Sequence, residues 1–418
     1  MRNILTREQA VLEAGRCLYC YDAPCEKACP SAVPVPEFIR SITTGNLKGA
    51  MEIITEANPM IDICGELCPA FCQDVCTRTQ INSPIRIREL HRYVTGNADM
   101  AENLEVPAAK GGKVAIIGGG PAGLACAREL RLKGYSPYVY EKDKPGGIPM
   151  QEVSSGRLPE DRAGRETGFI NDNFVSGVID EDVDSAQELL KSYDAVFVSA
   201  GLAEERDLGI PGESLKGVYK AREILRDIKN GVRSKAGKRI GVIGGGNVAV
   251  ETAAALKAED PSRDVEIIYR RGMKEIKAFA DEIEEANELG VTFQFMSIPK
   301  EIKGGGRVEG ILLTRAHLGE PDASGRRRPQ PVPGSDFTIP LDTIVVAVGQ
   351  QADKAFPGIS RKADGLIDTG EDMMTNIKGI FAGGDIVRGA STIVECASDG
   401  KSAALKIAKF IEGGVMNV

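Results

Sequence analysis

Eight of the ten cysteines in this chain fall within its first 76 residues, and no other feature restricts the fold as strongly. They follow the spacing C-x2-C-x4-C-x3-C-P and then, after a gap, C-x3-C-P-x2-C-x3-C. Zinc sites usually join C-x2-C pairs across a longer loop, whereas four close cysteines ending in proline are typical of ferredoxin-like iron-sulfur ligands. The spacing therefore favours iron-sulfur clusters, with structural zinc as the alternative. The eight residues are Cys17, Cys20, Cys25, Cys29, Cys64, Cys68, Cys72 and Cys76.

Composition and charge exclude several classes of protein. The chain has 418 residues, of which 42% are hydrophobic and 27% charged, as is ordinary for two or three globular domains. Its net charge of -8 argues against a nucleic-acid partner, which would need a basic face. The N-terminus lacks a signal-peptide core, and no apolar run reaches the ~18 residues of a membrane span. We therefore expect a cytoplasmic protein whose clustered thiols are metal ligands rather than disulfides.

The first glycine-rich loop has the sequence context of a dinucleotide-binding unit. The apolar strand Lys113–Ile117 runs into Gly118–Gly123, a helix is expected over 121–133, and the strand Ser136–Tyr140 follows. In such a loop the glycines permit a tight turn, let the backbone approach a pyrophosphate and allow close packing of helix on strand. The candidate cofactor-binding residues are Gly118, Gly120, Ala122 and Gly123.

A second copy of this unit lies further along the chain. The strand Arg239–Ile243 is followed by Gly244–Ala249, by an expected helix to about residue 258, and by the strand Val265–Tyr269. Because both loops stand between an apolar strand and an amphipathic helix, the repeat predicts two nucleotide sites. The candidates in the second site are Gly244, Gly246, Asn247 and Val248.

The residues that end the second strand of each unit distinguish the two nucleotides. Glu141 can accept hydrogen bonds from ribose hydroxyls, which suits an adenosine without a 2′-phosphate, such as that of FAD. Arg270 and Arg271 can instead donate to a 2′-phosphate. The second site should therefore favour NADP(H) over NAD(H).

Three further segments predict cofactor contacts. Ala195–Gly201 and Thr343–Gly349 are apolar strands that end in small residues, where a cofactor could pass close to the backbone. Gly379–Asp385 places an acid after a strand and before an expected helix over 391–411, where it could bind the ribityl hydroxyls of a flavin. The candidates are Gly201, Gly349, Gly384 and Asp385.

The motifs, taken in order, resemble those of one family. They are C-x2-C-x4-C-x3-C-P, K-V-A-I-I-G-G-G-P-A-G, G-V-I-G-G-G-N-V-A, Y-R-R and G-I-F-A-G-G-D. The set resembles the glutamate synthase small-subunit family, which includes the amino-terminal part of dihydropyrimidine dehydrogenase and the large subunit of ferredoxin:NADP transhydrogenase. The segment CLYCYDAPCEKACP is most similar to the flavin subunit of bacterial dihydropyrimidine dehydrogenases. The resemblance covers nearly the whole chain.

This resemblance implies an α/β fold with an amino-terminal α-helical iron-sulfur domain and two Rossmann-like nucleotide-binding domains. The helical domain, expected over residues 1–107, would hold two 4Fe-4S clusters. An FAD-binding domain over 108–206 and 338–418 would be interrupted by an inserted NAD(P)H-binding domain over 207–337.

The family pattern also implies the cluster ligands. One cluster would be held by Cys29, Cys68, Cys72 and Cys76, and the other by Cys17, Cys20, Cys25 and His91. His91 stands in the I-x-x-L-[Q/E] position, where relatives carry glutamine or glutamate, and Glu89 is the alternative neighbour. Cys64 is then a spare cysteine. Neutral imidazole in place of a carboxylate should raise the potential of its cluster.

The match weakens after Pro145–Gly147. This chain has IPMQEVSSG before Arg157, where relatives have a G-I-P segment, and residues 160–192 are polar and poorly periodic. Gly147 and Arg157 remain candidate cofactor contacts. Three interpretations are open: the flavin pocket is remodelled for another partner, the flavin is held more loosely, or the segment becomes ordered against another subunit.

These features predict an NAD(P)H-dependent oxidoreductase subunit that passes electrons between NADP(H), FAD and two 4Fe-4S clusters. Such a reaction needs no general base, and we expect Cys126 and Cys396 to be core residues. The clusters imply a hetero-oligomer with a partner subunit, such as a pyrimidine reductase, a glutamate synthase or a ferredoxin-linked complex. The alternative is a non-catalytic subunit for electron relay and assembly.

Overall fold

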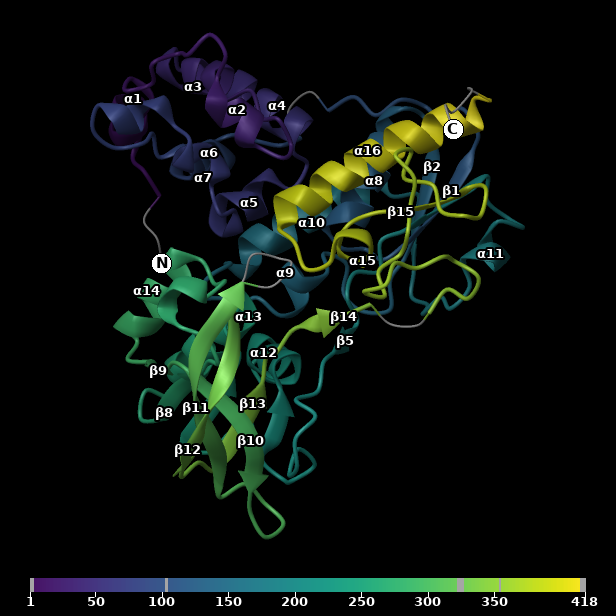
Figure 1. The fold of residues 1–418 in the computed structure, drawn as a ribbon. Helices are drawn as coiled ribbons and strands as arrows, with labels where there is room; N and C mark the ends of the chain where they lie inside the picture. Colours follow the sequence, from purple (N-terminus) through teal and green to yellow (C-terminus); the bar gives the residue numbers. More distant parts are fainter. Residues whose placement is uncertain (1–3, 102–103, 322–326, 353–354, 414–418) are drawn as a thin grey trace. The chain divides into compact units, whose positions relative to one another are not determined.

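The computed structural model describes residues 4–101, 104–321, 327–352 and 355–413, which divide into two compact units (Figure 1). The first unit comprises residues 1–151, 155–203 and 352–418, and the second comprises 152–154 and 204–351. The second unit is thus inserted in the sequence of the first.

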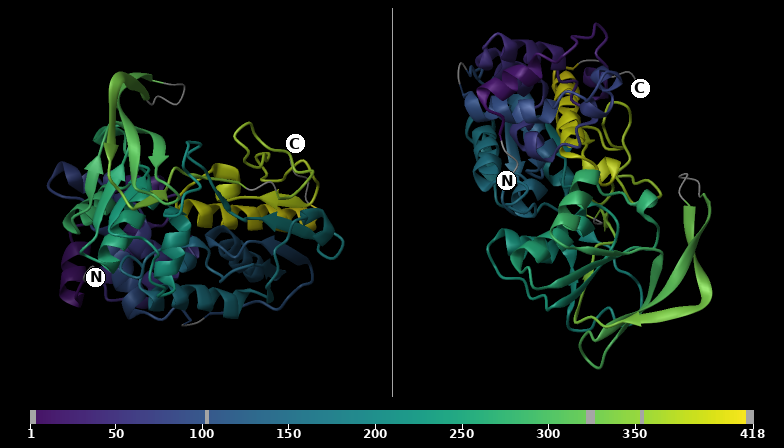
Figure 2. Two further views of the ribbon diagram at one scale, coloured as in Figure 1. Left: turned by 90° about the horizontal axis from the view of Figure 1, so that it is seen from below. Right: turned by 90° about the vertical axis from the view of Figure 1, so that its left-hand side faces the viewer.

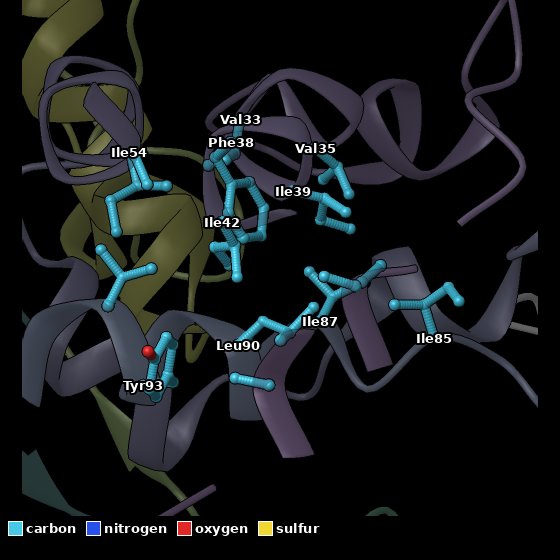
Figure 3. Packing of buried hydrophobic residues seen from close by; sticks show 14 of the residues in the cluster. Val33, Val35, Phe38, Ile39, Ile42, Ile54, Ile85, Ile87, Leu90 and Tyr93 are labelled. Carbon is cyan, nitrogen blue, oxygen red and sulfur yellow. The ribbon is translucent and has the colours of Figure 1, made fainter. Parts of the chain in front are cut away.

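The amino-terminal part of the first unit is helical, as expected. In α3 the buried residues Val35, Phe38, Ile39 and Ile42 recur at the spacing of one helix face. Figure 3 shows them pointing toward the buried residues of α7, with which they form one core. The elements are α1 (Arg7–Ala14), α2 (Pro24–Ala28), α3 (Val35–Thr43), α4 (Leu47–Ala57), α5 (Ile61–Leu67), α6 (Phe71–Asp74), η1 (Thr77–Gln80) and α7 (Ile87–Asn97).

A five-stranded parallel sheet follows, with the strand order β15-β4-β1-β2-β3. Helices α8 and α16 pack closely, because a Cβ on Gly400 would lie 2.1 Å from the Ala122 carbonyl oxygen. The strands are β1 (Lys113–Ile117), β2 (Ser136–Tyr140), β3 (Gly177–Ile179), β4 (Ala195–Val198) and β15 (Ile380–Ala382). The helices are α8 (Pro121–Leu132), α9 (Ile148–Gln151), α10 (Glu160–Phe174), α11 (Ala186–Leu189), α15 (Asp385–Arg388) and α16 (Ile393–Ile411).

The polar segment after Arg157 is more regular than its sequence suggested. Residues 160–174 form α10, a helix of 15 residues, and β3 joins the edge of the sheet. The helical period was hidden because the buried face of α10 carries charged side chains, Arg162 and Glu166, beside apolar ones. The segment therefore forms regular structure that packs against α8 and α5 of the same unit.

The second unit contains a parallel sheet with the strand order β6-β13-β7-β8-β9 and an antiparallel sheet β10-β11-β12. The antiparallel sheet forms a long twisted ribbon, drawn in light green in Figure 2. The strands are β5 (Glu204–Glu205), β6 (Val218–Lys220), β7 (Arg239–Ile243), β8 (Asp264–Ile268), β9 (Thr292–Gln294), β10 (Ser297–Lys303), β11 (Gly310–Pro321), β12 (Arg327–Ile339), β13 (Thr343–Val346) and β14 (Gln350–Gln351). The helices are α12 (Ala221–Lys229), α13 (Asn247–Glu259), η2 (Met273–Glu275) and α14 (Ala280–Glu288).

One strand belongs to a different sheet from the one expected. We predicted Thr343–Gly349 in the flavin domain, but β13 pairs with β6 and β7 in the second unit. The carboxyl boundary of the insertion accordingly lies after residue 351 instead of 337. The sequence of a buried apolar strand does not specify which of two parallel sheets it joins. The α/β architecture itself agrees with the prediction.

The unusual stretch before Arg157 has a structural role in the second unit. Glu152 is buried and accepts hydrogen bonds from Arg222 Nη2 (2.6 Å) and Arg226 Nε (3.1 Å) on α12. The backbone N–H of Ser154 donates to Glu251 on α13 (3.3 Å). Residues 152–154 thus pack with the second unit although their sequence neighbours belong to the first.

Among the helices in the described part of the chain, none combines the length and apolar character that a membrane crossing requires.

Candidate nucleotide and iron-sulfur sites

The first glycine-rich loop lies between β1 and α8. A Cβ on Gly123 would lie 2.0 Å from the Gly118 carbonyl oxygen, so the helix approaches the strand too closely for any other residue. Gly120 is the N-cap of α8 and no side chain caps the helix. The nearest atom to a Cβ on Gly120 would be Gly147 Cα, at 3.9 Å. The backbone at the helix start therefore has room beside it for a pyrophosphate.

The carboxylate of Glu141 lies beside this loop. Its Oε2 accepts the backbone N–H of Gly119 (2.8 Å), and its Oε1 accepts that of Asp143 (2.9 Å). Each oxygen keeps a further lone pair for a hydroxyl donor. The two backbone bonds fix the side chain at the carboxyl end of β2, where an adenosine ribose would bind.

Gly201 and Asp385 reach the same edge of the sheet, because they follow the parallel strands β4 and β15. Gly201 has a φ of 69°, and nothing lies within 4 Å of a Cβ built on it. Asp385 Oδ1 accepts hydrogen bonds from Ser391 N (3.1 Å) and Ser391 Oγ (2.6 Å). Burial raises the pKa of Asp385, and the Ser391 hydroxyl opposes this shift. The preceding Gly384 donates its N–H to Asp399 Oδ2 (3.0 Å).

Three other candidates for the first site lie nearby in the chain. Gly147 has a φ of 61° and packs on the first loop, since a Cβ there would lie 2.9 Å from Gly120 Cα. Arg157 is half-buried in the turns before α10. Ala122 is buried in the first turn of α8, against α16.

The second glycine-rich loop lies between β7 and α13. Gly246 is the N-cap of α13, a helix of 13 residues without a side-chain cap, and a Cβ there would have nothing within 4 Å. Asn247 Oδ1 accepts the N–H of Phe279 (3.1 Å), so its side chain holds the loop before α14. Val248 is half-buried on the first turn of α13, and Gly244 begins the turn after β7. This loop also leaves room at a helix start for a pyrophosphate.

Gly349 comes after a strand of the second sheet and not of the first, where we expected it. It follows β13 at the carboxyl edge of the second sheet, with a φ of 108° and nothing within 4 Å of a Cβ. Its expected role beside the flavin depended on β13 joining the other sheet. The open backbone at Gly349 instead faces the edge that carries the second loop.

The two arginines at the end of β8 differ in their exposure to solvent. Arg270 is exposed, whereas Arg271 is only 6% exposed and donates Nε to the carbonyl oxygen of Arg327 on β12 (3.0 Å). Arg271 therefore anchors the β11–β12 ribbon. Of the pair, Arg270 has the exposed side chain that a 2′-phosphate requires.

Four thiols of the helical domain line one cavity, and we term them the first thiol group. The group consists of Cys17, Cys20, Cys25 and Cys76. Burial raises the pKa of Cys25 to about 11, and the nearby thiols of Cys76 and Cys17 add to this shift. The structure thus places Cys76 with the amino-terminal cysteines, whereas the family pattern implied that it serves the other cluster. The chain after α6 turns Cys76 toward the amino-terminal cysteines, which the C-x3-C spacing does not reveal.

Three further thiols, Cys29, Cys68 and Cys72, form the second thiol group. Burial raises the pKa of Cys72, and the thiols of Cys68 and Cys29 contribute most of the remaining upward shift. Cys64 is buried nearby, and the side chain of Asn58 hydrogen-bonds to it. Within the described ranges, no three Cys, His, Asp or Glu side chains lie close enough to share a single metal ion.

His91 is buried in α7, where its ring stacks on Phe38 at a centroid distance of 4.7 Å. Burial lowers the pKa of His91 to about 4, so the imidazole is neutral near pH 7. No hydrogen-bond partner for Nε2 exists among the described residues. An unpaired buried nitrogen is costly, and a ligand bond would satisfy it.

Comparison with protein families bears on the choice between iron-sulfur and zinc that the sequence left open. The model for pyridine nucleotide-disulphide oxidoreductases matches residues 112–400. The chain belongs to this family. The model for the 4Fe-4S cluster domain of dihydropyrimidine dehydrogenase (domain II) matches residues 1–103, which favours iron-sulfur over zinc at the thiols.

Relatives of this oxidoreductase include subunits of larger enzymes. It is 35% identical to the β subunit of NADP(+)-dependent formate dehydrogenase of Moorella thermoacetica over 94% of this chain. It is 33% identical, again over 94%, to the β subunit of NADPH-Fe(3+) oxidoreductase of Geobacter sulfurreducens. The chain spans 60% and 64% of these two relatives.

The resemblance to glutamate synthase small subunits is confirmed. The oxidoreductase is 32% identical to the glutamate synthase [NADPH] small chain of Halomonas elongata, over 97% of this chain and 91% of that one. Among solved structures, Mycobacterium tuberculosis FprA in complex with NADPH matches with a TM-score of 0.64 at 22% identity, over 73% of this chain and 85% of that one. This structural match shows a shared fold.

In this oxidoreductase the second thiol group lies against the nucleotide-binding part of the first unit. Ser398 Oγ on α16 donates to the carbonyl oxygen of Pro30 (2.8 Å), the residue after Cys29. Ser31 Oγ donates to the Val394 carbonyl oxygen (3.3 Å). Helix α16 begins a few residues after Asp385, so these contacts connect Cys29 with the edge that carries the first nucleotide site.

Sequence reasoning missed these serines and the charged residues of α10. A single sequence holds one weak signal for the serines: a stretch rich in small residues, which includes Ser398 and Gly400, interrupts the bulky apolar residues of this helix. Such interruptions are typical of close helix contacts. The buried charges of α10 resemble those of a solvated helix, and only their burial identifies them.

Proposed function

We propose that this chain is the electron-transferring subunit of an NADPH-dependent oxidoreductase complex. It would bind FAD at the first site, NADPH at the second and a 4Fe-4S cluster at each thiol group. When bound, these groups would supply hydride transfer between nicotinamide and flavin and one-electron transfer through the clusters. The observation that carries the proposal is that helix α16, which follows the sheet edge with the first nucleotide loop, is in direct contact with the segment around Cys29.

Different residues of the first site would bind different parts of FAD. The loop at Gly120 would take the pyrophosphate, Glu141 the adenosine ribose and Asp385 the ribityl hydroxyls. The open backbone at Gly201 leaves room for the rest of the flavin. For NADPH, the loop at Gly246 would take the pyrophosphate, and the open backbone at Gly349 would line the same edge.

The two thiol groups differ in the number of cysteine ligands that they offer to a 4Fe-4S cluster. The first group already supplies four thiolates. The second supplies three. We assign His91 as its fourth ligand, and not as a ligand beside Cys17, Cys20 and Cys25 as the family pattern implied, because the first group already has four thiols and Nε2 is buried without a partner among the described residues, whereas Cys64 is hydrogen-bonded by Asn58. Replacing His91 with glutamate should lower the potential of this cluster, since a carboxylate adds negative charge.

The decisive experiment uses the whole chain purified without oxygen. NADPH should bleach the bound flavin and then produce the EPR signal of a reduced cluster. If flavin is bound and NADPH does not bleach it, the chain is a relay subunit and the proposed NADPH activity is wrong.

Arg270→Ala should weaken NADPH binding about tenfold to a hundredfold, because each hydrogen bond to a charged group is worth roughly 1.5–3 kcal/mol. NADH binding should change little. Arg271→Ala should instead lower the melting temperature and weaken both nucleotides alike, since Arg271 is buried against the ribbon. Arg233→Ala, which removes an exposed arginine of the same unit, is the control. Isothermal titration would measure the affinities, and equal losses of NADPH and NADH in Arg270→Ala would contradict the assignment.

The face around the first thiol group should contact the partner subunit. Leu18 is 41% exposed, Val75 is 44% exposed and Tyr21 is fully exposed, and each lies within two residues of a cysteine of the group. Exposed apolar side chains gathered around a redox site are typical of a transient protein interface. The partner would therefore be an electron-carrying protein that approaches these residues.

Tyr21→Asp should slow electron transfer to a ferredoxin acceptor about tenfold, which corresponds to roughly 1.4 kcal/mol, and leave transfer to ferricyanide unchanged. A small acceptor needs no protein interface. Leu405→Asp, at a 52% exposed leucine of α16, is the control. Stopped-flow absorbance would follow both acceptors, and an equal effect on both would contradict the interface.

A further inference from the structure

A buried ionic network joins α10 to the helices that carry the ligands of the second thiol group. Helix α5 ends at its C-cap Cys68, and α7 carries His91. Helix α10 belongs to the nucleotide-binding part of the first unit and packs against α5. The network consists of Asp62, Glu66, Arg92, Arg162, Arg165 and Glu166.

Glu166 binds the start of α5 directly. Its carboxylate is 1% exposed, with Oε1 accepting the N–H of Asp62 (2.7 Å) and Oε2 accepting that of Ile63 (2.9 Å). The N-cap residue of α5, Met60, contributes no side-chain cap. Without Glu166 these two N–H groups would be buried and unpaired, which is expensive. Glu166 therefore caps α5 from across the contact between the two domains of the unit.

Charged residues around the carboxylate hold the same helices. Arg162 Nη1 bonds to Asp62 Oδ1 (3.0 Å) and lies 3.3 Å from Glu66 Oε1, and Arg165 also pairs with Asp62. Arg92, adjacent to His91 in α7, pairs with Glu66 (3.1 Å). The arginines of α10 thus fix α5, and α5 in turn fixes α7.

The cost of burying Glu166 supports a specific role. Burial raises the pKa of Glu166 and the neighbouring Asp62 carboxylate adds to the shift, whereas the N–H groups of Ile63 and Asp62 and the Arg165 guanidinium favour the ionised carboxylate. A carboxyl group in such a place is retained only where its hydrogen bonds matter. The next residue along α10, Thr167, lies beside Gly146, since a Cβ on Gly146 would be 3.1 Å from its Oγ1, and Gly146 donates its N–H to the Gly119 carbonyl oxygen of the first glycine-rich loop (2.7 Å). Consecutive residues of one helix therefore lie against the thiol-bearing helix and against a residue that is hydrogen-bonded to the nucleotide loop.

We propose that Glu166 is a positioning residue for electron transfer, which fixes α5 and hence Cys68 at a set place relative to the flavin-binding edge. This inference rests on the proposed function, because it needs a flavin at the first site and a cluster at the second thiol group. Glu166 acts through α5 and touches neither group.

Glu166→Gln tests the role with little change in shape. An amide offers one acceptor and places an NH2 donor against a backbone N–H, so α5 should lose one bond of its cap. Reduction of the flavin by NADPH should stay within twofold of the wild type, whereas the EPR signal of the reduced cluster should appear at least tenfold more slowly. Hydrogen exchange at Asp62 and Ile63 should speed up at least tenfold. Asp172→Asn removes an exposed carboxylate from the same helix and is the matched control.

A second variant keeps the test valid if Glu166→Gln folds poorly. The side chain of Arg165 is 45% exposed, so Arg165→Gln removes its ion pair with Asp62 and should disturb the core less than Glu166→Gln does. This variant should slow cluster reduction severalfold. Cluster reduction at the wild-type rate in a folded variant, with faster exchange at α5, would overturn the inference. If NADPH fails to bleach the wild-type flavin, the proposed function fails, and flavin reduced by light then tests Glu166 independently of NADPH.

Discussion

Gly123→Ala is expected to abolish flavin retention. The added Cβ would lie 2.0 Å from the Gly118 carbonyl oxygen and 3.0 Å from Ser199 Oγ, and neither backbone nor strand can yield without opening the loop. Helix α8 would have to move away from β1, and the start of the helix would no longer meet the pyrophosphate. The bound flavin, measured by absorbance after gel filtration, should fall at least tenfold.

The matched control is Gly164→Ala. Gly164 lies within α10, and a Cβ there would have nothing within 4 Å. Alanine favours a helix over glycine by roughly 0.5–1 kcal/mol, so this variant should keep its flavin and melt at a slightly higher temperature. A Gly123→Ala protein with a full complement of flavin would show that the first loop does not hold the cofactor.

The parts of the fold that the sequence predicts well are the ones that local patterns determine. The strands Ser136–Tyr140 and Arg239–Ile243 were predicted to the residue, because each is a short apolar run beside a glycine-rich turn. The helix α3 follows the same logic, with its apolar residues repeating on one face. In these segments the periodicity of apolar residues determines both the type of secondary structure and which residues are buried.

Where the structure differs from the prediction, the cause is a different one. Each difference depends on which residues, distant in the sequence, a segment contacts. The placement of β13, the burial of Arg271 under β12 and the position of Cys76 are all decided by tertiary contacts. Helix α10 was missed because the charges on its buried face find partners in α5, far away in sequence. A single sequence shows residue types and spacing but not these partners.

The position of Cys76 has a consequence that iron analysis and EPR can measure. Cys76→Ala should remove the cluster of the first thiol group and leave that of the second, so about half of the iron should be lost. NADPH should still reduce the remaining cluster, because the second group is the one in contact with α16. Transfer to ferredoxin should fall at least tenfold, since the exposed residues Leu18 and Tyr21, which we propose contact the partner, are adjacent in sequence to Cys17 and Cys20 of the first thiol group.

Cys72→Ala should behave in the opposite way. It removes the cluster nearest α16, so the iron again falls by half, but NADPH should now fail to reduce the cluster that remains. Cys64→Ala should retain both clusters, because its thiol is hydrogen-bonded by Asn58 and belongs to neither group. If Cys72 and Cys76 served the same cluster, as their C-x3-C spacing suggests, their two variants would lose the same EPR signal. Different signals in the two variants, with the signal of Cys76→Ala still reducible by NADPH, would establish that electrons enter at the second thiol group and leave from the first.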